Sequence, residues 1–240
     1  ILEKSSIKRE NKEIEKADLI IPLFPSVAKE MKSKYKNGKI FYFGNVINSL
    51  IQADEYLIIQ RKMNSKRLLF IGSTKYLEGA RCLIEAFVIL KDKYPDLFLD
   101  IIGMLPGDFE YLPSDVKCYG FLDKGIDEHR QLYYSLLENS KMYINTTPKW
   151  AAFSASIEAM YFYNPVIITE YQEFVKTFGS EINFGIYCKE NTVNTLCASI
   201  ETILNHKLYT DLCLNAHSTV KDYTWSNYID KILDKIKQTL

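Results

Sequence analysis

Apolar residues along the chain gather in short, strand-sized runs that are separated by longer stretches of helical periodicity. A charged stretch with a helical pattern, residues 5–16, leads into the first apolar run at 18–23. A helical stretch over 27–36, introduced by a Pro-Ser pair, precedes the second apolar run at 39–43. This order predicts a β-α-β unit with short connections at the start of the chain.

A weakly periodic segment, residues 44–66, follows and is expected to be a linker with a little local structure. Strand-like runs and helical stretches alternate regularly after it, which predicts an α/β fold: a Rossmann-like parallel sheet with helices on both faces. Such sheets bind ligands at the carboxyl ends of their strands. The expected strands are 68–71, 97–102, 116–119, 141–145, 165–169 and 184–188, and the expected helices are 77–94, 127–137, 154–163, 170–177 and the remainder from 191.

The composition of the 240 residues is that of a globular protein, with 47% hydrophobic and 25% charged residues, which excludes a disordered chain, a collagen and a coiled coil. Thirty basic residues balance thirty acidic ones, so no net field draws the chain to nucleic acid or to an anionic membrane. The apolar runs are shorter than the ~18 residues of a membrane helix, which predicts a soluble protein. Five dispersed cysteines suggest neither a disulfide framework nor zinc, and favour a reducing compartment.

The loop after the first regular strand is a candidate phosphate site. Gly72 allows a phosphate close to the backbone, and Ser73, Thr74 and Lys75 offer donors and positive charge near the start of a helix. The loop matches neither the Walker A motif nor G-x-G-x-x-G. A tight turn between strand and helix is an equally good interpretation of Gly72.

A second candidate lies in residues 150–160, where small residues crowd a loop and the start of a helix. Free N–H groups at a helix start attract phosphate, and the Glu158 carboxylate can accept two hydrogen bonds from a vicinal diol such as that of ribose. The alternative is that Glu158 only interacts favourably with the helix dipole, which contributes about 0.3–1 kcal/mol.

A third candidate is the strand-end turn at 119–124, whose backbone groups can contact the edge of a nucleobase but equally suit a plain turn. The three histidines fall on helical stretches that are expected to be solvated, and no ligand spacing relates them, so no metal site is expected. The serines near the second loop lack the nucleophile-elbow pattern, which argues against a hydrolase.

Several of these segments together carry a family resemblance. The sequence resembles a retaining glycosyltransferase of family 4, the group 1 transferases, with the GT-B fold, from about residue 68 to the C-terminus. The segments at 17–21 and 39–44 resemble the last strand–helix–strand of that family's acceptor domain. The resemblance rests on 68–72, Gly79 with 83–87, 100–103, 116–120, 157–160, 165–168 and 223–225.

The resemblance implies that this part of the protein holds a nucleotide-sugar donor, with sugar transfer at a cleft between two domains and retention of anomeric configuration. Glu158 matches the second Glu of the family's E-x7-E motif, which holds the ribose hydroxyls. Phe153 and Ser154 match backbone donors to the diphosphate. The turn formed by Gly120, Phe121 and Leu122 matches the segment that contacts the base.

Three positions depart from the family pattern. Trp150 stands where the first Glu of the motif contacts the donor sugar, and Ser73 and Glu78 replace the Arg and Lys that clamp the diphosphate. Loss of a preorganised cationic donor costs about 2.7–4 kcal/mol in such a transition state, although Lys75 can substitute for one of the two. A degenerate, non-catalytic binding or scaffolding subunit is therefore the alternative, and an epimerase on the same fold is a third hypothesis.

The family pattern divides the chain into four parts: residues 1–44 as the end of an acceptor domain, 45–66 as a linker, 67–222 as the donor domain and 223–240 as a crossover helix. Within the full-length protein the expected partners are the nucleotide-sugar and a glycan or lipid-linked acceptor, bound through a missing domain, without a cofactor, metal or nucleic acid. The expected location is cytoplasmic, at the inner membrane face if the full-length protein associates peripherally with the membrane. This fragment alone is expected to be inactive.

Overall fold

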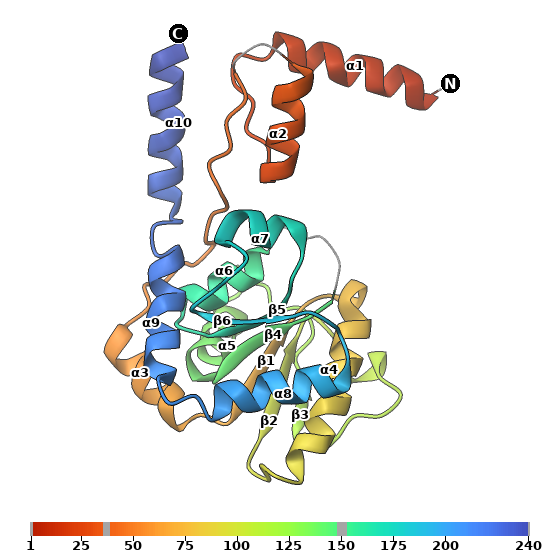
Figure 1. The fold of residues 1–240 in the computed structure, drawn as a ribbon, viewed down its shortest axis with the longest axis vertical. Helices are drawn as coiled ribbons and strands as arrows, with labels where there is room; N and C mark the ends of the chain where they lie inside the picture. The colour runs from red at the N-terminus through yellow and green to blue at the C-terminus, as the bar shows by residue number, and fades with distance from the viewer. Residues whose placement is uncertain (1, 36–38, 148–152, 240) are drawn as a thin grey trace.

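The structure, a computed structural model, describes residues 2–35, 39–147 and 153–239. Six parallel strands form one sheet in the order β3-β2-β1-β4-β5-β6, which confirms the expected α/β Rossmann-like fold class (Figure 1). The chain moves outward from β1 in one direction and then restarts at β4 in the other, so the strand order reverses between β1 and β4. The strands are β1 (Arg67–Ile71), β2 (Phe98–Ile102), β3 (Val116–Cys118), β4 (Met142–Asn145), β5 (Val166–Thr169) and β6 (Gly185–Cys188).

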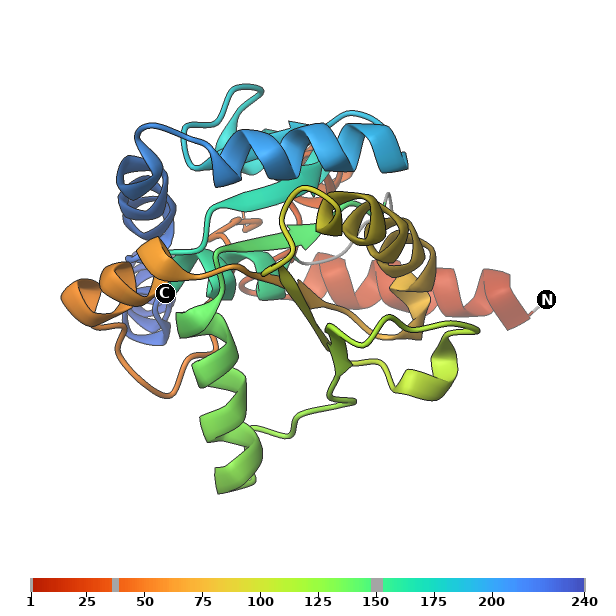
Figure 2. The same ribbon diagram turned by 90° about the horizontal axis from the view of Figure 1, so that it is seen from below.

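Helices cover both faces of this sheet. α4 and α8 pack against each other on one face, while α5, α6, α9 and α3 cover the other (Figure 2). α1, α2 and α10 extend away from the sheet on one side of the molecule (Figure 1). The α-helices are α1 (Leu2–Lys16), α2 (Pro25–Lys34), α3 (Glu55–Asn64), α4 (Leu77–Lys91), α5 (Asp127–Asn139), α6 (Ser154–Tyr161), α7 (Gln172–Phe178), α8 (Val193–Leu204), α9 (Tyr209–Val220) and α10 (Trp225–Thr239), and the two 3₁₀ turns are η1 (Thr74–Tyr76) and η2 (Pro106–Asp108).

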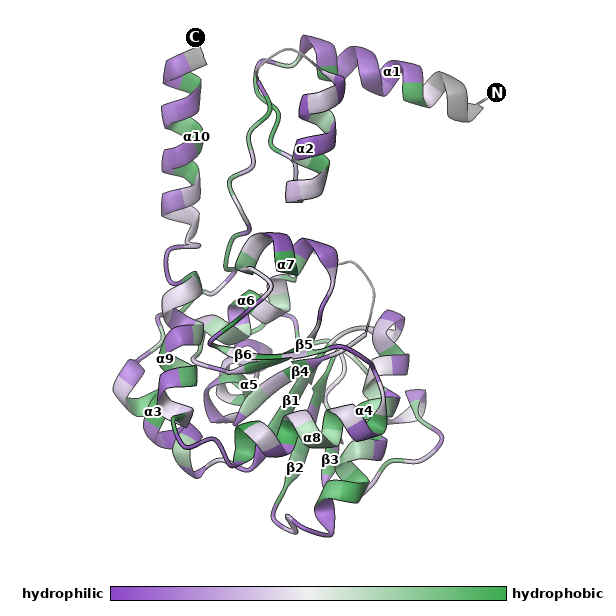
Figure 3. Cartoon of the chain, viewed as in Figure 1, coloured by the Kyte–Doolittle hydropathy of each residue, from purple (hydrophilic) through white to green (hydrophobic). Residues whose placement is uncertain are grey.

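The sheet forms the centre of the hydrophobic core because helices shield its strands from both sides. Leu68, Leu69 and Phe70 of β1 are fully buried. Figure 3 shows the central strands in the green of hydrophobic residues. Full burial of each such side chain contributes about 1.5–3 kcal/mol. This explains why the central strands are continuous apolar runs rather than alternating ones.

One charged side chain interrupts the apolar pattern of β2. Asp100 is fully buried, and its carboxylate accepts hydrogen bonds from the Arg67 guanidinium at 2.6 and 2.7 Å and from the Tyr119 hydroxyl at 2.8 Å. The hydrogen bonds to Asp100 raise the pKa of Arg67. A buried carboxylate with three donors is electrostatically satisfied, so it links β1, β2 and the end of β3.

The first two apolar runs do not form the strands that the sequence predicts. A single parallel bridge, Ile20 to Ile40, joins them within the described residues, with α2 between. The Ile20 N–H donates to the Lys39 carbonyl at 2.9 Å, and the Ile20 carbonyl accepts from Phe41 at 2.9 Å. Pro22 lies inside the first run and has no N–H to donate, which prevents a longer ladder. The β-α-β order is thus present in its shortest form.

The expected linker contains the helix α3, which packs against α5 and α9. Lys62 of α3 is fully buried, and its ammonium donates to the carbonyls of Leu137 and Ser140 and to Oδ1 of Asn164, at 2.8 to 2.9 Å. Burial lowers the pKa of Lys62 to about 7. Because all three donors of the ammonium have acceptors, Lys62 holds α3 against α5 and against the residue Asn164 before β5.

His217 departs from the expectation of a solvated side chain. His217 is half-buried on α9, and its ring stacks on Tyr163 with centroids 4.1 Å apart. Its Nδ1 lies 2.6 Å from the Tyr161 carbonyl, and burial lowers the pKa of the imidazole. The His217 ring therefore acts as a packing element between α9 and α6.

Candidate functional site

A cavity of about 190 Å³ lies at the carboxyl ends of β1, β4 and β5, where the strand order reverses. Open α/β sheets bind ligands in this crevice, because the loops on its two sides diverge there. Gly72 ends β1 at the cavity, and α6 begins at its wall. The lining residues are Ile71, Gly72, Tyr76, Tyr143, Asn145, Thr147, Phe153, Ser154, Ala155, Ser156, Ile168 and Tyr171.

The N-terminus of α6 supplies hydrogen-bond donors to this cavity. The first N–H to bond within the helix is that of Ile157, which donates to the Phe153 carbonyl at 3.1 Å. The N–H groups of Ser154, Ala155 and Ser156 therefore point out of the helix end, and all three residues line the cavity. A helix start of this kind attracts an anion through its free donors and its dipole.

Phe153 fixes the direction of the chain as it enters α6. Its backbone is left-handed, with φ of 38°, a conformation that costs free energy in a residue with a large side chain. The ring is buried against Phe174 and Phe178 at centroid distances of 5.3 and 5.7 Å. This packing offsets the backbone strain, so the backbone of Phe153, rather than its side chain, is left to contact a ligand.

The described lining of the cavity is electrically neutral. Tyr143 is fully buried, and burial raises the pKa of its hydroxyl to about 12. Burial also raises the pKa of Tyr171. Both phenols are protonated donors at neutral pH, so neither places a negative charge beside a phosphate.

Glycines at the ends of β1, β2 and β3 allow the neighbouring loops to approach closely. Gly103 has φ of +95°, and a Cβ there would lie 2.6 Å from the Gly72 carbonyl oxygen. The Gly103 N–H donates to the Gly120 carbonyl at 2.7 Å, and Gly120 has φ of +67°. Side chains at these positions would separate the loops that follow the strands.

Glu158 lies one helical turn beyond Ser154 on α6 and does not line the cavity. Its carboxylate is buried and accepts from the Lys124 ammonium at 2.8 and 3.1 Å and from the Tyr133 hydroxyl at 2.8 Å. Burial, and after it the neighbouring charge of Glu158, raises the pKa of Tyr133 well above its usual value, so this phenol stays protonated and donates a hydrogen bond to Glu158. The sequence predicts Glu158 as a site residue but predicts neither of its partners.

Lys124 and Tyr133 escaped prediction because their roles depend on tertiary contact. They lie 34 and 25 residues before Glu158. Lys124 ends the strand-end turn that was singled out for its backbone, and the only available signal was a basic residue after the third expected strand. Tyr133 occupies a position of the helical pattern that any core-facing residue of a helix would occupy, so the pattern indicates no further role for it.

The other predicted residues lie at varying distances from the cavity wall. Ser73 and Lys75 have exposed side chains and do not line the cavity, and neither does Glu78. Phe121 is 80% exposed, whereas Leu122 is buried. Trp150 lies outside the described residues. Among residues 2–35, 39–147 and 153–239, no group of three His, Cys, Asp or Glu side chains is placed to hold a metal ion.

Comparison with known proteins places this geometry in context. No protein-family model matches the chain. An uncharacterised glycosyltransferase of Haemophilus influenzae is 24% identical over 230 residues, which cover 93% of this chain and 61% of that protein. The chain thus spans less than two thirds of the length of this relative.

Solved glycosyltransferase structures share the fold. TarM superposes with a TM-score of 0.68 at 18% identity, covering 95% of this chain and 46% of TarM, and a mutant of S. aureus TarM was solved with fondaparinux, alpha-GlcNAc-glycerol and UDP. Anabaena HepE, solved with UDP and glucose, has a TM-score of 0.66 at 17% identity, over 96% of this chain and 65% of HepE. The chain has the Rossmann-like fold of GT-B glycosyltransferases.

Within the described part of the chain, no helix is long and apolar enough to cross a membrane.

Proposed function

We propose that this chain is the donor-binding part of a glycosyltransferase that transfers a hexosyl group from a nucleotide-sugar with retention of configuration. The observation that carries the proposal is the neutral cavity at the β1/β4 reversal, which is lined by the first three residues of α6, whose N–H groups precede the first hydrogen bond of the helix. The distant resemblance to the Haemophilus glycosyltransferase and the fold shared with UDP-bound TarM and HepE support it.

The spacing along α6 suits a nucleoside diphosphate. Ser154 lines the cavity, and Glu158 follows four residues later, a rise of about 6 Å along the helix axis. A diphosphate over the helix start would therefore have its ribose within reach of the Glu158 carboxylate. The exposed ring of Phe121, on the loop after β3, is available to stack on a base.

The chemistry of transfer requires stabilisation of negative charge on the departing diphosphate. The α6 N-terminus and the hydroxyls of Tyr143 and Ser156 are neutral donors for this role, and Lys75 is the nearest candidate cation along the β1 loop. We propose no metal and no cofactor, because neutral donors and the helix dipole suit an anion without one. The donor nucleotide-sugar is thus the proposed ligand.

The acceptor is proposed to be a glycan or a lipid-linked sugar in surface-polysaccharide assembly, such as lipopolysaccharide or capsule, on the cytoplasmic side of the membrane. It would bind between this unit and a further domain of the full-length protein, of which residues 1–44 are proposed to be the end. Residues 45–66 and 223–240 are the proposed connections. The Haemophilus relative is longer than this chain, which covers 61% of it, and this difference in length supports the proposal of a further domain.

Isothermal titration calorimetry with UDP, GDP and ADP, and with their sugar conjugates, tests the proposal. At least one of these ligands should bind with an affinity between micromolar and millimolar. Absence of heat with all of them, at protein concentrations that detect millimolar binding, would contradict the donor-binding role. That result would favour a non-catalytic subunit, the interpretation to which Ser73 and Glu78 point.

A further inference from the structure

Lys124 joins two parts of the chain that are distant in sequence. Its ammonium donates to both oxygens of Glu158, at 2.8 and 3.1 Å, and to the carbonyl of Asn48 at 3.0 Å. The Lys124 side chain is 26% exposed, whereas that of Glu158 is 6% exposed. An ammonium has three donors, so this one side chain connects α6 to the segment before α3.

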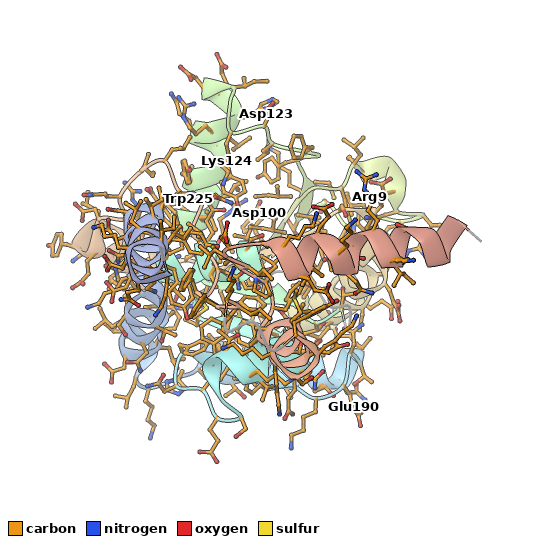
Figure 4. The ribbon with its side chains drawn as sticks, turned by 90° about the horizontal axis from the view of Figure 1, so that it is seen from above. Arg9, Asp100, Asp123, Lys124, Glu190 and Trp225 are labelled. Carbon is orange, nitrogen blue, oxygen red and sulfur yellow. The ribbon has the colours of Figure 1, made fainter. Side chains whose placement is uncertain are left out.

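The segment around Asn48 is in turn bonded to the start of α10. The Asn48 Oδ1 atom accepts from the Trp225 indole N–H at 3.1 Å, and the Ile47 N–H donates to the Tyr223 carbonyl at 2.8 Å. Figure 4 shows Lys124 and Trp225 on the same part of the molecule, seen from above. Three contacts thus connect Glu158 with α10: Lys124 with Glu158, Lys124 with the Asn48 carbonyl, and Trp225 with the Asn48 side chain.

Two segments connect the part of the chain that forms the sheet and its covering helices to α1, α2 and α10. Residues 44–50 lead from α2 into α3, and residues 221–225 lead from α9 into α10. We call these two segments the crossings. Both crossings are bonded to one another and, through Lys124, to Glu158.

The carboxylate has little capacity left for a ligand. A carboxylate offers about four acceptor positions, and Glu158 already accepts two hydrogen bonds from Lys124 and one from Tyr133. A vicinal diol donates two hydrogen bonds, so at least one existing bond must break. Tyr133 is 6% exposed and Lys124 is nearer to solvent, so the hydrogen bonds that break when a diol binds are those of the Lys124 ammonium.

We propose that Lys124 couples the nucleotide site to the crossings: a ribose diol that binds Glu158 displaces the ammonium, which releases the Asn48 carbonyl and loosens both crossings. The inference rests on the proposed function for its ligand, a nucleoside diphosphate, and adds Lys124 as a positioning residue. Binding at Glu158 thereby frees α1, α2 and α10 to move relative to the sheet.

Amide hydrogen exchange at the crossings tests the proposal, with the Ile47 amide as the reporter. In the ligand-free protein, Lys124→Met should accelerate Ile47 exchange about tenfold, the effect of losing a hydrogen bond to a charged group. Saturating nucleoside diphosphate should accelerate the same amide in the wild type and add nothing in Lys124→Met. Lys124→Arg keeps a cationic donor and should restore both the protection and the response, and Lys117→Met, an exposed lysine on β3, is the matched control.

The outcomes separate this inference from the proposed function. Unchanged Ile47 exchange in ligand-free Lys124→Met would overturn the coupling whatever the ligand. Calorimetric binding of a nucleotide to the wild type without faster Ile47 exchange would overturn the coupling and leave the donor-binding role standing. Absence of binding by UDP, GDP and ADP would overturn both.

Discussion

A Cβ atom on Gly79 would lie 2.0 Å from Oγ1 of Thr147, so the first turn of α4 touches Thr147, two residues after β4, with no side chain between them. The Thr147 hydroxyl also approaches the Tyr76 carbonyl at 3.4 Å, and both residues line the cavity. The helix after β1 and the loop after β4, on the two sides of the crevice, are therefore in direct contact through Thr147.

Gly79→Ala should destabilise the protein by about 1–3 kcal/mol, because the added methyl group forces α4 away from Thr147. Urea unfolding monitored by circular dichroism measures the change. Gly107→Ala is the matched control, since no atom lies within 4 Å of a Cβ there. Thr147→Ala removes the nearest atom and should recover part of the loss in the double variant. An unchanged unfolding midpoint in Gly79→Ala would show that the two segments do not touch.

Ala155→Leu should weaken binding of a nucleoside diphosphate by about tenfold or more, because the larger side chain occupies the cavity at the α6 start. Calorimetric titration measures the affinity, and the unfolding midpoint verifies that the variant is folded. Ala198→Leu makes the same substitution on the exposed face of α8 and should bind as the wild type does. Equal affinities for the two variants would place the ligand elsewhere.

Lys62→Met should alter the pH dependence of stability. Burial lowers the pKa of Lys62 to about 7, against 10.5 in the unfolded chain, so the unfolded state binds more protons and stability rises as pH increases from about 7 to 9. This rise should amount to as much as about 2 kcal/mol and be absent from Lys62→Met. The pKa of Lys141 is lowered to about 8 by burial and contributes in the same direction, so a smaller slope should remain.

Urea unfolding at pH 7, 8 and 9 provides the measurement for Lys62. Lys207→Met, an exposed lysine between α8 and α9, should keep the wild-type slope. Identical slopes in the wild type and Lys62→Met would mean that Lys62 stays charged within the fold.

Arg67→Met should destabilise the protein, because it leaves the carboxylate of the buried Asp100 with only the Tyr119 hydroxyl. Removal of one partner of a fully buried pair costs about 3–5 kcal/mol, and the 35% exposure of the Arg67 side chain places this case below that range. Unfolding at pH 7 measures the loss. Arg67→Lys should recover part of it, whereas equal stability of the Met variant and the wild type would contradict a structural role for the pair.

Strand positions from residue 67 onward were predictable because the sheet is covered on both faces. Continuous apolar runs such as β1 and β5 have one stable environment, and their bounds fall within one residue of the predicted ones. The first two apolar runs also have strand-like patterns, yet they form only the Ile20 to Ile40 bridge. Local pattern does not reveal how many partners a strand finds.

The residues of the candidate site likewise include some that the sequence locates and some that it does not. Gly72, Phe153 and Ser154 follow strand ends or begin helices, so sequence position alone locates them at the crevice, and all three line the cavity. The ion pair between Lys124 and Glu158 joins residues 34 positions apart, which no periodicity encodes. Lys75 lies in the loop that follows β1, as predicted, but its side chain is exposed and does not line the cavity.

The most direct test of the account compares Glu158→Gln with the wild type for the diphosphate that binds and for its 2′-deoxy analogue. If the Glu158 carboxylate holds the ribose diol, the wild type should prefer the ribose form by about tenfold, and Glu158→Gln should lose most of that preference. Glu78→Gln, on the exposed surface of α4, should retain it. Equal preference for the ribose form in the wild type and in folded Glu158→Gln would contradict the proposed ribose site.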